Sequence, residues 1–206
     1  MGVKRKSLQE KILAKVVRRG RGTVFFGEEF LDMGRADAVR QALSRLARAG
    51  TIRRITTALY HYPEFNDKLG GELPPSADTV AQAIARRTDS RIVASGALAA
   101  NLLGLSTQVP AKRVYLTNGP SRDVSIGSNI LSFRHASPRR MAANGKISAI
   151  VFEAFRYLKK ENVTNNVVTR LRRILPPAAK AELHRDLPHA AVWMRPLIER
   201  ITGDEI

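Results

Sequence analysis

The residues with the clearest chemical potential in this chain are the arginine, glutamine and serine side chains between positions 35 and 49. Stepped at 100° per residue, as in an α-helix, Val39 and Leu43 fall on one face, and Gln41 and Ser44 fall near the opposite one. Arginine hydrogen-bonds to guanine, glutamine to adenine, and serine to either base. The predicted contacts with base edges are Arg35, Asp37, Arg40, Gln41 and Ser44, and the predicted contacts with phosphates are Arg45 and Arg48.

Further basic residues flank this predicted helix. Arg53 and Arg54 stand beside a predicted hairpin tip, and hairpins of this kind commonly lie along a DNA backbone or in its minor groove. Residues 1–56 contain fourteen Lys and Arg against five Asp and Glu, so +9 of the chain's +17 charge lies there. Because such an excess is costly in self-repulsion, double-stranded DNA is the expected partner. A basic arm is predicted at Lys4, Arg5 and Lys6.

Apolar periodicity and turn formers predict the elements that position these residues. A helix runs from Leu8 until Gly20, and a β-prone run follows at 23–26. One or two helical turns at 27–33, a helix at 35–49 and strands at 51–55 and 58–62 complete the series. This order is that of a winged helix-turn-helix over residues 1–63.

The remainder of the chain is predicted to be a linker and a second domain. Residues 64–75 are rich in turn formers and are expected to be the linker. Helices are expected to begin at Ser76 and at Ser95, and strands to lie at 113–117 and 130–133. Beyond residue 146 the pattern is wholly helical. The expected fold class is α+β, with a mixed, mainly helical C-terminal domain over residues 76–206.

Several classes of function lack the residues they require. Cysteine is absent, which excludes a thiol nucleophile and Cys-ligated zinc. The four histidines have no partner at a metal-binding spacing, and His61 is expected to be a phosphate contact or plain surface. No phosphate-binding glycine loop or carboxylate pair is found. We therefore predict no catalytic residue, metal or cofactor, and no enzyme. Without an apolar run of about 18 residues or a signal-peptide core, a cytoplasmic protein with no membrane partner is expected.

Another basic cluster follows the predicted strand at 130–133. It consists of Arg134, His135, Arg139 and Arg140. A solvated surface, a phosphate site and a surface for an acidic protein are all compatible with it. Arg170, Arg172 and Arg173 are better explained as the polar face of a later helix.

Three stretches resemble one known family. They are the run Ala-Leu-Ser-Arg-Leu-Ala-Arg-Ala-Gly-Thr-Ile-Arg-Arg-Ile at 42–55 with Ala-Leu-Tyr-His-Tyr-Pro at 58–63, Asn-Leu-Leu-Gly-Leu-Ser-Thr-Gln-Val-Pro-Ala at 101–111, and Val-Tyr-Leu-Thr-Asn-Gly-Pro-Ser-Arg at 114–122. The segment from Leu171 to Met194 is also similar. On these residues the chain resembles the AbiEi-type antitoxins, with 101–122 the most specific part. It departs from them at Ala58, where relatives usually have glycine before Leu-Tyr.

The resemblance implies a type IV toxin–antitoxin or abortive infection system. The antitoxin of such a system represses its own operon by binding inverted repeats, and it counteracts a nucleotidyltransferase-like toxin encoded beside it. The family's winged helix binds DNA, and its C-terminal domain is associated with neutralisation. By position, the DNA-facing residues implied are Arg35, Arg40, Gln41, Arg45, Arg53 and Arg54.

Two alternatives stay open from the sequence. One is a regulator whose winged helix mainly assembles a protein complex and binds DNA weakly and without specificity. The other is a nucleic-acid-modifying enzyme, although the carboxylate clusters it needs are not found. The oligomeric state is also open, because either a dimer or two monomers can fill an inverted repeat.

Overall fold

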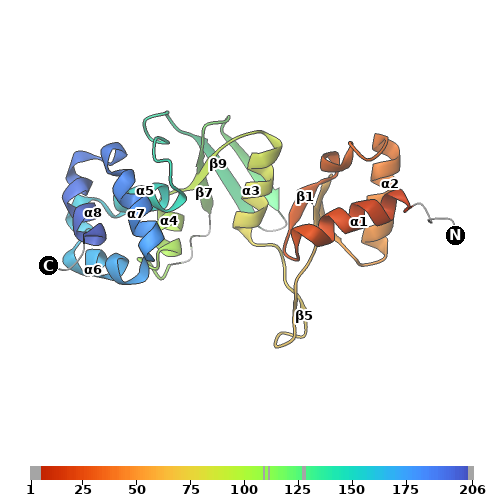
Figure 1. The fold of residues 1–206 in the computed structure, drawn as a ribbon, viewed down its shortest axis with the longest axis horizontal. Coiled ribbons are helices and arrows are strands. Elements are labelled where there is room, and N and C mark those ends of the chain that lie inside the picture. Colours follow the sequence, from red (N-terminus) through yellow and green to blue (C-terminus); the bar gives the residue numbers. More distant parts are fainter. Residues whose placement is uncertain (1–5, 109, 111, 127–128, 204–206) are drawn as a thin grey trace. The chain divides into compact units, whose positions relative to one another are not determined.

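The structure is a computed structural model that describes residues 6–108, 110, 112–126 and 129–203 (Figure 1). The chain is a mixture of helices and small sheets, about half of it helical. It divides into two compact units, Met1–Asp89 and Ser90–Ile206, which we call the first and second unit. The expected α+β class agrees with this content at the level of mixed helix and strand.

The first unit begins with helix, strand, short helix, longer helix and hairpin, as its periodicity predicts. The elements are α1 (Leu8–Arg19), β1 (Val24–Phe26), the 3-10 helix η1 (Gly27–Phe30), α2 (Ala36–Arg48), β2 (Arg53–Thr56) and β3 (Leu59–His61). The three strands form one antiparallel sheet in the order β1-β3-β2.

Local chemistry sets where α1 begins and ends. Ser7 accepts a hydrogen bond from the backbone N–H of Glu10 at 3.2 Å, and the Glu10 carboxylate accepts one from the Ser7 N–H at 2.7 Å. This reciprocal capping box satisfies two backbone donors that a helix start leaves without partners. Gly20 ends the helix with a φ of 89°, a conformation that glycine adopts without steric cost.

An aromatic cluster forms the core of the first unit. The Phe25 ring meets Phe30 edge-on, with centroids 5.4 Å apart, and stacks on Tyr60 at 6.0 Å. The apolar stripe of α2 packs onto this cluster through Val39, Ala42, Leu43 and Leu46, each buried. Because the stripe faces inward, the arginine-rich face of α2 is left to solvent.

The turn between β2 and β3 places a non-glycine residue in the left-handed region. Ala58, the residue at which the sequence departs from its AbiEi-type resemblance, has a φ of 61°. Its carbonyl accepts the N–H of Gly27 at 2.9 Å, so the turn is also bonded to η1. An L-residue in this conformation costs roughly 1–2 kcal/mol.

Replacing Ala58 with glycine is therefore expected to stabilise the first unit by about 1 kcal/mol, because glycine removes the Cβ strain. Amide hydrogen exchange of the β3 strand measures the change. The control is Ala38→Gly, at an exposed position in the first turn of α2, which is expected to destabilise by up to about 1 kcal/mol. Exchange of the β3 amides that is no slower in Ala58→Gly than in the unchanged protein would contradict the prediction.

The predicted linker at 64–75 contains a small hairpin. Its strands are β4 (Phe65–Asn66) and β5 (Gly71–Glu72), paired antiparallel. The next helix, α3 (Ala77–Arg87), begins as expected at Ser76, whose hydroxyl accepts the Thr79 N–H at 3.0 Å.

The first unit extends to Asp89 and includes α3, whereas the second domain was expected to begin at residue 76. The reason lies in contacts distant along the chain. Arg87 donates to both carboxylate oxygens of Glu28, at 2.8 and 3.1 Å, and its guanidinium lies 4.6 Å from the Phe26 ring centroid. Arg86 donates to the carbonyl of Val24 at 3.1 Å. Turn formers in the sequence carry no information about such contacts.

The second unit combines a four-stranded sheet with a group of helices. The strands are β6 (Ile92–Ala94), β7 (Arg113–Thr117), β8 (Arg122–Ile126) and β9 (Asn129–His135), in the order β6-β7-β9-β8. Only β7 and β9 are parallel among these described pairs. The helices are α4 (Ala97–Leu102), α5 (Lys146–Leu158), α6 (Asn165–Ile174), α7 (Pro177–Arg185) and α8 (Arg195–Thr202), with 3-10 turns η2 (Lys160–Asn162), η3 (Leu187–His189) and η4 (Val192–Met194).

Two expectations for the second unit were wrong or incomplete. The predicted strands at 113–117 and 130–133 are present, but β6 and β8 were not predicted. β6 has only three residues, and β8 is rich in polar residues. Ser95 does not cap α4, which begins after Gly96. Its hydroxyl instead donates to the buried carboxylate of Glu153 at 2.9 Å.

The start of α5 is capped by carboxylates from another part of the chain. Asp186 accepts the backbone N–H groups of residues 144 and 145, at 3.2 and 2.7 Å. Glu182 accepts those of residues 147 and 148, at 2.7 and 3.1 Å. Burial by itself raises the pKa of Asp186, but the hydrogen bonds it accepts bring that pKa below its ordinary value. These carboxylates supply the partners that the helix start lacks.

Candidate nucleic-acid interface

The solvent face of α2 presents most of the side chains predicted to contact DNA. Arg35, Asp37, Arg40, Gln41, Arg45 and Arg48 are exposed, and Ser44 is half-buried. Arg40 forms an ion pair with Asp37, one helical turn away. Both side chains of this pair are about 70% exposed, with values of 70% and 71%. Such a pair is worth little in water, so Arg40 is available to another anion.

The two arginines of the hairpin lie on opposite faces of it. Arg53 forms an ion pair with Glu72 of β5, at 2.7 Å. Arg54 instead donates to the Tyr60 hydroxyl at 3.2 Å, and its guanidinium lies 5.6 Å from the Tyr60 ring centroid. Successive side chains of a strand point to opposite faces, which separates these neighbours. The structure thus brings Arg54, but not Arg53, to the side on which Tyr60 lies.

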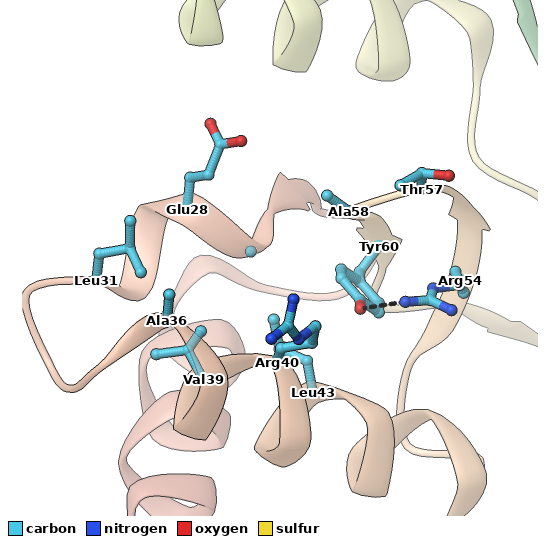
Figure 2. Close-up of a pocket in the computed structure, with 11 residues that line it drawn as sticks. Glu28, Leu31, Ala36, Val39, Arg40, Leu43, Arg54, Thr57, Ala58 and Tyr60 are labelled. Atoms are coloured by element: carbon cyan, nitrogen blue, oxygen red, sulfur yellow. Dashed lines mark hydrogen bonds between the residues drawn. The ribbon is translucent and has the colours of Figure 1, made fainter.

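A pocket of about 260 Å³ joins α2 to the hairpin. Arg40 comes from α2 and Arg54 from β2, and Figure 2 shows Arg54 bonded to the Tyr60 hydroxyl and Arg40 in the same lining. The other polar side chains on it are those of Glu28 and Thr57. The apolar part of the lining consists of Leu31, Ala36, Val39, Leu43 and Ala58. We call this the α2–hairpin pocket.

The sequence did not single out Tyr60, although it holds Arg54 in place. The available signal was cross-strand pairing, because Arg54 and Tyr60 are direct partners in the β2–β3 ladder. That pairing depends on register, and β2 contains an irregularity between Arg54 and Thr56 that shifts it. Turn chemistry alone does not give such a register.

The predicted N-terminal arm falls mostly outside the described residues. Lys4 and Arg5 lie there, and Lys6 is exposed just before α1.

The net charges of the two units differ less than the +9 counted over residues 1–56 implies. The first unit has seventeen Lys and Arg against ten acidic residues, or +7, and the second has eighteen against eight, or +10. The placement of the arginines, rather than their number, marks the α2 face.

Comparison with known proteins places the chain in a family. Residues 11–183, from within α1 to within α7, match a family of unknown function, DUF6088. The chain belongs to the DUF6088 family. No curated protein matches it. Among solved structures, it is similar to the RV2827C protein from Mycobacterium tuberculosis, at 13% identity and a TM-score of 0.42, over 99% of this chain and 85% of that one.

His61 of this DUF6088 member is a core residue, so its prediction as a phosphate contact or surface residue was wrong. It lies in β3 and is 2% exposed. Burial lowers the pKa of its imidazole, and the charges of Glu72 and Glu64 only partly oppose that shift. β3 is the central strand of the sheet, with β1 and β2 on either side, and all three of its residues are buried.

The first unit should therefore lose stability on acidification. Folding favours the neutral imidazole, whereas the unfolded chain takes up a proton near pH 6.5. Stability contributed by neutral His61 is present above that pH and falls as the pH is lowered toward about 5. Urea midpoints across this range, for the protein and for His61→Gln, measure the effect. Equal pH dependence in both proteins would contradict it.

The second basic cluster of this DUF6088 member does not form one site. Arg134 pairs with Asp123 at 2.8 Å, and the hydrogen bond it donates lowers the pKa of that carboxyl. The His135 ring contacts the carbonyl of Gly119 at 3.0 Å. Arg140 binds both oxygens of Glu153, at 3.0 and 2.8 Å. Most of the cluster is thus directed at internal partners, and Arg139 is exposed.

The described part of the DUF6088 chain offers little to hold a metal or to span a membrane. Among its residues, no group of three His, Asp or Glu side chains is placed to bind a metal ion. Every described helix is also too short or too polar to cross a lipid bilayer. The exposed face of α2 and the α2–hairpin pocket are therefore the candidate functional site.

Proposed function

We propose that the chain is a DNA-binding regulator whose first unit acts as a winged helix-turn-helix. In this proposal α2 is the recognition helix and the β2–β3 hairpin is the wing. The single observation that supports it best is the convergence of Arg40, from the exposed face of α2, and Arg54, from the hairpin, on one pocket. A helix and a wing that offer cations on one side are suited to follow a phosphate backbone while the helix enters the major groove.

In this proposal, the position of each residue along α2 decides whether it contacts a base edge or a phosphate. Arg35 is the N-cap of α2, and Arg40 and Gln41 lie in its first half, which enters the groove most deeply in helix-turn-helix proteins. Ser44, just past the middle of α2, is the last of the residues assigned to base edges. Arg45 and Arg48 follow in its last turn and are exposed, so they would contact phosphates. Arg53 is already paired with Glu72, which makes it the weakest member of the predicted set.

We further propose that the protein is an antitoxin and autorepressor of a type IV toxin–antitoxin operon. The support is the resemblance of residues 42–63 and 101–122 to AbiEi-type antitoxins. In such a system the second unit would contact a nucleotidyltransferase-like toxin in the cytoplasm. The protein itself would perform no chemistry. Repression requires only that it occupies its own operator.

A gel-shift titration with the DNA upstream of this gene tests the proposal. Labelled upstream fragment is titrated at 50 and 200 mM salt against an excess of scrambled competitor of equal length. We expect a shift at nanomolar to submicromolar protein that survives the competitor, as for specific sites. If scrambled DNA removes the shift, specific repression is wrong. Co-purification with the neighbouring gene product but no operator binding would instead favour a protein-interaction regulator.

A further inference from the structure

The α2–hairpin pocket has the composition of a small-molecule site. Its lining is mostly apolar, with Val39 and Leu43 from the core stripe of α2 and Leu31 next to η1. Leu31 is 49% exposed, so a ligand over it would bury additional apolar surface. At about 260 Å³ the pocket is near the lower limit for ligand sites, so it suits a ligand of one ring rather than a nucleotide.

The charged side chains on the pocket select the ligand's charge. Glu28, its one acidic residue, is already held by two hydrogen bonds from Arg87, at 2.8 and 3.1 Å. Among the described residues, Arg40 is paired only with the exposed Asp37, and Arg54 gives one hydrogen bond to Tyr60. Each guanidinium has five N–H donors, so both retain donors for a further acceptor. The uncompensated charge on the pocket is therefore positive.

We propose that this pocket binds a small organic acid with an apolar body, such as an aromatic carboxylate. The ring would cover the exposed parts of Leu31, Ala36 and Ala58, since Val39 and Leu43 are already almost fully buried. The carboxylate would accept hydrogen bonds from Arg40 and Arg54. A free phosphate would leave the apolar lining uncovered. A neutral ring would offer no charged acceptor to the remaining N–H donors of Arg40 and Arg54.

Binding of such an acid would also regulate the proposed function. Arg40 and Arg54 would be occupied by the carboxylate, and both are assigned to DNA in the proposal above. The acid and the operator would therefore compete, as linkage requires for two ligands that share residues. The pocket itself does not depend on DNA binding, but this regulatory consequence rests on the proposed function.

An NMR titration of the full chain with benzoate tests the pocket. We expect saturable shifts of amides in η1, the start of α2 and the β2–β3 turn. Acetate, which lacks the ring, and benzamide, which lacks the charge, should each bind at least tenfold more weakly. Arg54→Gln should weaken benzoate binding about tenfold, the effect of one charge-assisted hydrogen bond. Arg53→Gln is the matched control and should change it less than twofold.

Other outcomes would overturn the proposal that the pocket binds an aromatic carboxylate. Equal binding of benzamide and benzoate would remove the role assigned to the arginines. Equal binding of acetate and benzoate, or an equal loss in Arg53→Gln, would show only general anion binding to a basic surface. Chemical shift changes that do not saturate, or that spread over both units, would also show only general anion binding.

A second arm separates this inference from the proposed function. Benzoate is added to the gel shift with upstream DNA, and it should weaken the shift of the protein more than that of Arg54→Gln. If benzoate binds in the NMR titration but the protein has no operator, the proposed function fails and the pocket stands. If the operator is bound and benzoate produces no saturable shift, the pocket fails and the proposed function stands. If both bind without competing, the regulatory consequence is wrong.

Discussion

Replacing Arg40 and Arg54 together by glutamine is expected to weaken binding to the upstream DNA by about 30-fold to 20,000-fold. Each arginine that contacts a base or phosphate contributes about 1–3 kcal/mol, and every 1.4 kcal/mol is about tenfold in affinity. Glutamine keeps a polar side chain but removes the charge. Both positions are on the surface of the pocket rather than in the core, so the fold should persist.

The salt dependence of the same titration distinguishes base contacts from phosphate contacts. With about five to seven phosphate contacts, raising salt from 50 to 200 mM should weaken binding by roughly two to four orders of magnitude. Loss of one phosphate contact lowers the slope of log K against log salt by about one. If Arg40 contacts a base, its single variant should instead lose discrimination between operator and scrambled DNA.

Arg53→Gln is the control for the double variant. It removes the same charge from the adjacent residue, but Arg53 is held by Glu72 on the other face of the hairpin. We expect it to lose less than about tenfold in affinity, the limit set by a single weak contact. An equal loss in Arg53→Gln and Arg54→Gln, or a flat salt response, would contradict arginine-driven binding by the α2 side of the hairpin.

The second large effect is expected at Gly145, just before α5. Its φ of −77° is available to any residue, so alanine brings no backbone strain. A Cβ there would, however, overlap the carboxyl group of Glu182. Glu182 would have to release the N–H groups of residues 147 and 148 that it caps. Because hydrogen bonds to charged groups are worth about 1.5–3 kcal/mol, Gly145→Ala should destabilise the second unit by about 2–4 kcal/mol.

A double-mutant cycle separates the steric cause from any other. Glu182→Ala alone should cost about as much as Gly145→Ala, since it removes the same cap. In the Glu182→Ala background there is no carboxyl group to displace, and Gly145→Ala should then cost less than about 0.5 kcal/mol. Urea denaturation of the four proteins, followed by hydrogen exchange of α5 amides, gives these free energies. Additive losses would show that Gly145 acts independently of Glu182.

Features governed by neighbours along the chain were predicted from the sequence. The limits of α1 were predicted from Leu8 and Gly20, and the start of α3 from the capping side chain of Ser76. The exposed arginine-rich face of α2 followed from a 3.6-residue period. These signals are local, because a helix cap or an apolar stripe is complete within a few residues.

Features that depend on partners distant in the sequence were not predicted. Ser95 has the side chain of a helix cap, yet it bonds to Glu153, 58 residues away. His61 was placed on the surface because its position in the middle of the sheet was not known. The extension of the first unit through α3 likewise rests on Arg87 and Glu28.

The sequence by itself determined the limits of α1, the start of α3, and the exposed face, buried face and basic character of α2. Only the tertiary structure decided which cations act together. Arg53 and Arg54 are adjacent and chemically identical, but the register of β2 against β3 directs Arg54 to Tyr60 and the α2 side, and Arg53 to Glu72. The physical reason is that a strand alternates its side chains between two faces, and the identity of each face is set by what packs there.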